Sequence, residues 1–139
     1  MKKMNNKGFS LVELIIVIAI MAILIAVLAP QYIKYVEKSR QSSDLDNWQS
    51  IINAVQVAYA DTEKPATGTN TVTCTSGSIG HTGDISWGDL GVDLDKMTMK
   101  SKMYGQTGQI EASAGSDGIV TIKCKNNSSL ASQLGLASN

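Results

Sequence analysis

The apolar residues of this chain are concentrated in one long run near its start. All 16 residues from Leu14 to Ala29 are apolar, and extension back to Phe9 gives 21 positions of which only Ser10 and Glu13 are polar. At 1.5 Å per residue, a helix of this length would extend about 31 Å, the thickness of the hydrocarbon core of a bilayer. The run therefore predicts a membrane-spanning helix.

Beyond Pro30 the pattern becomes that of an amphipathic helix. Apolar side chains recur at three- and four-residue spacing, which places them on one helix face. They are Leu45, Trp48, Ile51, Ile52, Val55, Ala58 and Tyr59. Charged residues, Asp44 and Asp46 among them, fill the section between the apolar run and this stripe. We expect one helix from about Phe9 to Ala60, ended by the turn signals at Lys64-Pro65 and Thr67-Gly68.

Pro30 lies inside this predicted helix. Its ring lacks a backbone donor and clashes with the carbonyl of Ala26, so we expect the helix to kink or loosen there. The residues that follow the helix are too few to cover its apolar half before Pro30. This half therefore needs lipid or other copies of itself around it.

The residues after the helix predict a small β-rich domain. Thr71–Thr75 alternates like a strand, and 108–112 and 118–124 flank a turn at 114–118, which is typical of a hairpin. Met97–Lys100 is a candidate further strand, and Ser129–Leu134 a short helix ended by Gly135. We expect Val72, Ile119, Val120 and Ile122 to face the stripe of the long helix.

These patterns predict an α+β fold. A long N-terminal α-helix, whose first half is apolar and protruding, packs on a small antiparallel β-sheet domain.

Charge and motifs exclude several classes of function. The chain has 12 basic and 12 acidic side chains and no basic stripe, so nucleic-acid binding is not expected. No GxSxG motif, phosphate-binding loop or catalytic carboxylate pair occurs, so we do not expect an enzyme. Lys2, Lys3 and Lys7 precede the apolar run and favour a cytoplasmic N-terminus.

The two cysteines, Cys74 and Cys124, both follow the apolar run. An even count in a segment outside the cytoplasm predicts one disulfide. Closing a loop of roughly 50 residues would stabilise the domain by about 4 kcal/mol in the chain-entropy model. Two free, buried cysteines are the alternative.

Three interpretations of the apolar run differ in what they explain. A secretory signal peptide has a shorter apolar core, and Pro30 would follow a cut after Val27-Leu28-Ala29, where it fits a protease poorly. A plain single-pass anchor leaves Glu13 unexplained, because a carboxylate inside the span costs a few kcal/mol and is usually functional. The third interpretation rests on the residues around Glu13.

The stretch Lys7-Gly8-Phe9-Ser10-Leu11-Val12-Glu13 resembles the class III signal of type IV prepilins and related pseudopilins. The resemblance covers about the first 60 residues. It implies that a prepilin peptidase cuts between Gly8 and Phe9, and that the new Phe9 amine is N-methylated. The expected parts are a leader at 1–8, an assembly helix at 9–30, an amphipathic half at 31–62 and a β-rich head at 63–139.

The resemblance also implies the function of a structural subunit. The chain would be held in the cytoplasmic membrane with its N-terminus inside, then polymerise with other copies into a helical surface filament for adhesion, motility or biofilm formation. Glu13 would meet the Phe9 ammonium of a neighbour and fix the axial register. Pro30 is also expected to serve assembly, because a proline is common at this place in the family and the segment before it partly unwinds in assembled filaments. Many relatives have a glycine at the position of Ala22, so the extent of helix unwinding stays open.

Two alternatives to a filament subunit remain. One is a pseudopilin of a type II secretion or competence system, and the other is a membrane-tethered domain that does not polymerise. Secretion pseudopilins often bind calcium in this half, which draws attention to Asp89, Asp93 and Asp95, but the spacing lacks a calcium-loop pattern and a solvated loop is expected. His81 is isolated and expected in a loop. No metal or cofactor is predicted.

Overall fold

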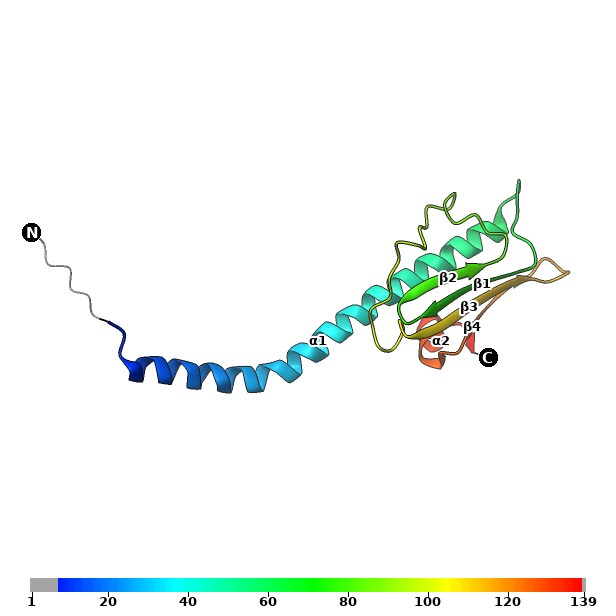
Figure 1. Ribbon diagram of the computed structural model, residues 1–139. Helices are drawn as coiled ribbons and strands as arrows, with labels where there is room; N and C mark the ends of the chain where they lie inside the picture. The colour runs from blue at the N-terminus through cyan, green and yellow to red at the C-terminus, as the bar shows by residue number, and fades with distance from the viewer. Residues whose placement is uncertain (1–7, 139) are drawn as a thin grey trace, which may run out of the picture. The chain divides into compact units, whose positions relative to one another are not determined.

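The structure is a computed structural model that describes residues 8–138. The chain forms two compact units, one ending at Val36 and one beginning at Glu37. The elements in order are α1 (Leu11–Ala60), β1 (Thr69–Thr75), β2 (Ser78–Thr82), β3 (Thr107–Ala114), β4 (Val120–Lys125), α2 (Ser128–Leu134) and β5 (Ala137–Ser138). The predicted α+β class is confirmed, with a long N-terminal helix and a small sheet (Figure 1).

The part of α1 that follows Glu37 supplies one side of the core. Its buried apolar residues are Trp48, Ile51, Ile52, Ala54, Val55 and Ala58, with Leu45 and Tyr59 partly buried beside them. They lie on one face because residues three and four apart are neighbours on a helix. The predicted apolar stripe is therefore confirmed as the face that packs against the sheet.

The sheet has the order β2-β1-β3-β4-β5, with antiparallel pairing from β2 to β4. The predicted strand at 71–75 and the hairpin of β3 and β4 are confirmed. The predicted antiparallel sheet is confirmed for β2 to β4, and β5 adds one parallel pair with β4, so the whole sheet is mixed. The intervening helix α2 returns the chain to the start of the strand, which parallel pairing requires.

The strands alternate between a buried and a polar face. Every second residue of β1 and β3 is buried against α1, in the order Asn70, Val72, Cys74 and Gly108, Ile110, Ala112. Of the four residues predicted to face the helix, Val72 is buried and Ile122 is partly buried. Ile119 and Val120 are instead 63% and 36% exposed, because they lie at the tip of the hairpin, beyond the helix-covered part of the sheet.

Gly108 permits a close approach between helix and sheet. A Cβ at this position would lie 3.1 Å from Leu130 Cδ2 and 3.2 Å from Trp48 Cζ2. The indole of Trp48 is fully buried there and donates its Nε1–H to the Tyr104 carbonyl at 3.3 Å. A side chain in this strand position would force Leu130 and Trp48 to shift by a few tenths of an ångström.

The segment between β2 and β3 differs from the prediction. Met97–Lys100 forms no strand, and only a single bridge joins Thr98 to Ser78. The segment is held instead by carboxylates of α1, which bind its backbone N–H groups. Strand β2 lacks a run of apolar residues, so the sequence pattern did not predict it.

The short helix α2 begins at Ser128, one residue before the predicted start, and its end before Gly135 is as predicted. Its N-cap Asn127 accepts a hydrogen bond from the Leu130 N–H at 2.9 Å. Gly135 ends it in the left-handed region at φ 66°, a conformation that glycine adopts without a steric cost.

The predicted disulfide between Cys74 and Cys124 is wrong for this structure, because both thiols are free and buried. Cys74 lies on β1 and Cys124 on β4, with β3 between them. Two strand spacings separate their backbones by about 10 Å, whereas a disulfide needs Cα atoms within about 7 Å.

Candidate functional site: the start of the apolar helix

The residues predicted to form the cleavage site lie immediately before α1. Gly8, Phe9 and Ser10 are non-helical and exposed, and the helix begins at Leu11. Nothing lies within 4 Å of the place a Gly8 Cβ would occupy, and the Phe9 side chain is 87% exposed. The rest of the predicted leader, residues 1–7, lies outside the described residues.

Glu13 has a local partner that the sequence analysis did not identify. Its Oε2 accepts a hydrogen bond from the Ser10 N–H at 2.9 Å, and the Ser10 carbonyl accepts from the Leu14 N–H at 3.2 Å. Ser10 is therefore the N-cap of α1. The spacing Ser-x-x-Glu is the sequence signature of a capping box, in which the third helical residue binds back to the cap.

The cap gives Glu13 a role within its own chain. Its carboxylate satisfies an otherwise unpaired N–H and lies at the positive end of the helix dipole, so it stabilises the helix start within one chain. Its predicted partner, in contrast, is the amine created at Phe9 of a neighbouring copy. A test of Glu13 must therefore separate the cap from the charge.

The first part of α1 exposes its apolar side chains. Every residue from Leu11 to Tyr35 is exposed, and by length and composition this part of the helix could cross a membrane. A water-soluble domain does not expose so continuous an apolar surface. The segment therefore requires another apolar environment, either lipid or other protein helices.

Pro30 does not end the helix. Helix α1 continues through this residue to Ala60. A proline in a helix interior removes one hydrogen bond of the ladder, so this turn is the weakest of the apolar segment. Its predicted role in assembly stays a prediction.

Two carboxylates of α1 fix the segment that joins β2 to β3. Asp44 is only 1% exposed, and its two oxygens accept the N–H groups of Lys100 at 2.9 and 3.1 Å and of Ser101 at 2.7 Å. Glu37 accepts the Lys102 N–H at 2.6 Å. Sequence analysis missed Asp44, although it precedes Trp48 by four residues and so lies on the apolar stripe.

A second polar network closes the other end of the head, around the buried side chain of Asn70. Asn70 donates to Tyr59 Oη at 2.9 Å and to Asp84 Oδ1 at 3.0 Å. Thr67 donates its hydroxyl to Asp84 Oδ2 at 2.6 Å. These hydrogen bonds, led by the one from the Thr67 side chain, lower the pKa of Asp84 to about 2.

The residues considered for metal binding do not come together. Among residues 8–138, no three His, Cys, Asp or Glu side chains are placed to hold a metal ion. Asp93 pairs with Lys96 at 2.6 Å. His81 lies on strand β2 and not in the expected loop, and it packs against Trp87 with ring centroids 5.9 Å apart.

Comparison with known proteins adds evidence on the start of the chain. The sequence model of the family described as "Prokaryotic N-terminal methylation motif" matches residues 3–29. This range contains Gly8, Phe9 and Glu13. No solved structure matches the chain.

Curated relatives extend the similarity. The type IV major pilin protein PilA of Myxococcus xanthus is 35% identical over 43% of this chain and 27% of its own length. The type IV major fimbrial protein FimA of Dichelobacter nodosus is 37% identical over 45% of this chain and 39% of its own. The prepilin peptidase-dependent protein A of Clostridium perfringens is 33% identical over 68% of this chain and 73% of its own.

The chain therefore spans well under half of the two filament proteins that it matches and about three quarters of the Clostridium protein. The range matched by the family model, residues 3–29, includes the predicted cleavage site and the apolar run as far as Ala29. On this similarity, the chain belongs to the type IV pilin family.

Proposed function

We propose that this pilin is made as a precursor, cut between Gly8 and Phe9, N-methylated at Phe9 and polymerised into a surface filament. The observation that carries the proposal is the apolar segment of α1, whose side chains are exposed over 25 consecutive residues from Leu11 to Tyr35. Lipid covers this surface before assembly, and the same segments of neighbouring copies cover it afterwards.

Cleavage supplies the charge that assembly uses. The new α-ammonium at Phe9 has a reference pKa near 8 and is cationic at neutral pH. Among apolar helices this cation is stable only beside a carboxylate, and Glu13 is the only acidic residue between Phe9 and Val36. Pairing between neighbours fixes one axial offset, which apolar packing alone does not specify.

Glutamine at position 13 separates the two roles of Glu13. A glutamine at this helix position still accepts the Ser10 N–H and keeps the cap, but it carries no charge. Glu13→Gln should leave the chain folded and inserted in the membrane, yet reduce sheared filaments at least ten-fold. Glu13→Ala loses both the cap and the charge and serves as the comparison.

The measurement is electron microscopy and quantification of sheared filaments, with sequencing of the mature N-terminus. Wild-type filaments with Phe9 at the N-terminus are the expected result. An intact Met1, or a start near Gln31, would instead indicate a tethered domain that does not polymerise. Normal filament yield from Glu13→Gln would contradict the proposed role of the charge.

The alternative function, a pseudopilin of a secretion or competence system, is supported by one comparison. The Clostridium protein, aligned over 73% of its length, is named for its processing and not for a filament. A pseudopilin would be processed at Phe9 but absent from sheared surface filaments. The same fractionation therefore distinguishes the two functions, and surface filaments used for adhesion, motility or biofilm formation are our first proposal.

A further inference from the structure

Charge is unevenly distributed over the unit that begins at Glu37. Residues 83–96, here called the acidic edge, contain four aspartates and one lysine, a net charge of −3. Residues 118–138, here called the basic edge, contain Lys123 and Lys125 and no carboxylate side chain. The two segments therefore have opposite sign.

These segments lie at opposite edges of the same sheet. The acidic edge follows β2, the first strand in the order β2-β1-β3-β4-β5, and the basic edge consists of β4, α2 and β5 at the other end. Figure 1 shows the segment after β2 and the α2 region on opposite sides of β1 and β3.

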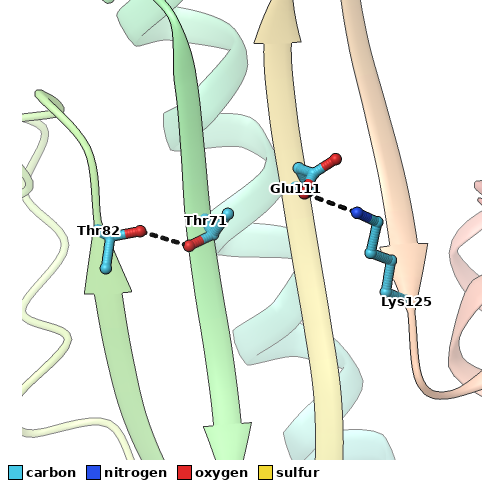
Figure 2. Close-up of polar contacts among 4 residues, drawn as sticks. All are labelled: Thr71, Thr82, Glu111 and Lys125. Atoms are coloured by element: carbon cyan, nitrogen blue, oxygen red, sulfur yellow. Dashed lines mark hydrogen bonds and ion pairs between the residues drawn. The ribbon is translucent and has the colours of Figure 1, made fainter.

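The charges of the two edges do not neutralise one another within one copy. β2 and β4 are three strand spacings apart, about 14 Å, and this exceeds the screening length of about 8 Å at physiological salt. The local ion pairs are Asp93–Lys96 at 2.6 Å and Lys125–Glu111 at 2.8 Å, the second drawn in Figure 2. Asp89, Asp95 and Lys123 have no ion pair among the described residues.

The acidic edge is also concave. A hollow of about 540 Å³ is lined by His81, Trp87, Asp93, Leu94 and Asp95 among others. Its lining combines the exposed carboxylates of Asp93 and Asp95 with the buried apolar residues Trp87 and Leu94. A lysine side chain fits such a site, because its charged end can meet a carboxylate while its methylene stem lies on apolar surface.

We propose that the acidic edge of one copy binds the basic edge of the next, with Lys123 directed at the hollow beside Asp95. This inference rests on the proposed filament function. Contact between two acidic or two basic edges would repel, so charge selects the head-to-tail arrangement. Such an arrangement uses two different surfaces and, if the rotation does not close, continues into an open helical polymer.

Charge-reversal substitutions in the full chain test the contact between the two edges. Lys123→Glu and Asp95→Lys should each weaken association between copies, by up to about five-fold per contact, as expected for an exposed ion pair. Because the contact recurs along a filament, we expect each single variant to lower the yield of sheared filaments and the double variant to restore it. Lys38→Glu, which reverses an exposed charge on α1 outside both edges, is the matched control.

A zero-length carbodiimide crosslink gives a readout that does not need filaments. Membranes containing two isotopically labelled populations of the full chain should yield mixed-label peptides that join Lys123 to Asp95 or Asp93. Such crosslinks support the edge contact even if wild-type filaments are absent, which would overturn only the proposed function. Mixed-label crosslinks confined to other residues, or failure of the double variant to restore filaments that the single variants lose, would overturn the edge contact.

Discussion

Asp44 lies among the apolar side chains of α1, and its environment explains why a charge is tolerated there. Three hydrogen bonds from the backbone N–H groups of Lys100 and Ser101 satisfy both of its oxygens. Buried carboxylates are stable when hydrogen bonds replace the lost water. The residue thus joins the helix to a segment that has almost no strand pairing of its own.

Replacement of Asp44 by alanine should destabilise the head by about 2–6 kcal/mol, because two N–H groups lose their acceptor at about 1–3 kcal/mol each. Urea unfolding of the detergent-solubilised chain measures the change. The control is Asp46→Ala, which removes an exposed carboxylate from the same helix and should change stability by less than about 0.5 kcal/mol. Equal effects of the two substitutions would contradict this account of Asp44.

The lowered pKa of Asp84 predicts that the head loses stability in acid. This pKa is lowered from 3.8 to about 2 in the folded chain by hydrogen bonds from Thr67 and Asn70. A lowered pKa contributes stability that is fully present above about pH 4 and is lost as the pH falls towards 2. Wild type should therefore lose more stability between pH 5 and pH 2.5 than Asp84→Asn, measured by urea unfolding at both pH values. Parallel losses in the two proteins would show that Asp84 contributes nothing.

At the scale of the elements, the order of the strands decides the state of the cysteines. β3 lies between β1 and β4, so Cys74 and Cys124 occupy the same buried face without meeting. The Cys74 thiol donates to the Gly105 carbonyl at 3.2 Å. Burial raises the pKa of both thiols, which makes them poor nucleophiles at neutral pH.

A thiol reagent should therefore find two free thiols per chain after denaturation without a reductant. In the folded chain the same reagent should react at least ten-fold more slowly, because both side chains are 1% exposed. Absorbance of the released chromophore measures both rates. Detection of no thiol in the unreduced, denatured chain would show that a bridge forms and that the strand order differs.

At the scale of the whole molecule, the two compact units require different surroundings. The unit from Glu37 onward contains all of the described buried apolar residues, whereas the apolar segment before it has none. A protein with its own core folds in water, and an exposed apolar helix does not remain soluble.

A fragment of residues 37–139 should accordingly be soluble without detergent and unfold cooperatively, with the circular dichroism of a mixed helix and sheet protein. The full chain should require detergent or lipid. If the fragment aggregated or lacked a cooperative transition, the core identified here would be insufficient for folding.

Much of the fold could be predicted because its signals are local. The stripe from Leu45 to Tyr59, the alternation of Thr71–Thr75, the β3–β4 hairpin and the glycine that ends α2 each depend on neighbours within a few residues. β2 and the parallel strand β5 were missed because both are short and have little apolar pattern. Their pairing depends on strands that are distant in sequence or separated from them by a helix.

In the candidate site too, some features can be predicted from the local sequence and others cannot. Gly8, Phe9 and Glu13 were identified from one short motif, and the Ser-x-x-Glu spacing already contained the cap that the structure shows. The spacing alone does not show whether Glu13 binds within its own chain or to another copy. Asp44 lies on the apolar stripe by its helical position, but its charge by itself predicts a solvent-exposed side chain.

The sequence by itself determined the apolar helix, its amphipathic continuation and the motif that places the chain among type IV pilins, because each is a pattern along the chain. Only the tertiary structure decided that the cysteines stay apart, that Asp44 is buried on backbone amides, and that opposite charges gather at opposite sheet edges. The physical reason is strand order and register, which are set by packing between residues far apart in sequence.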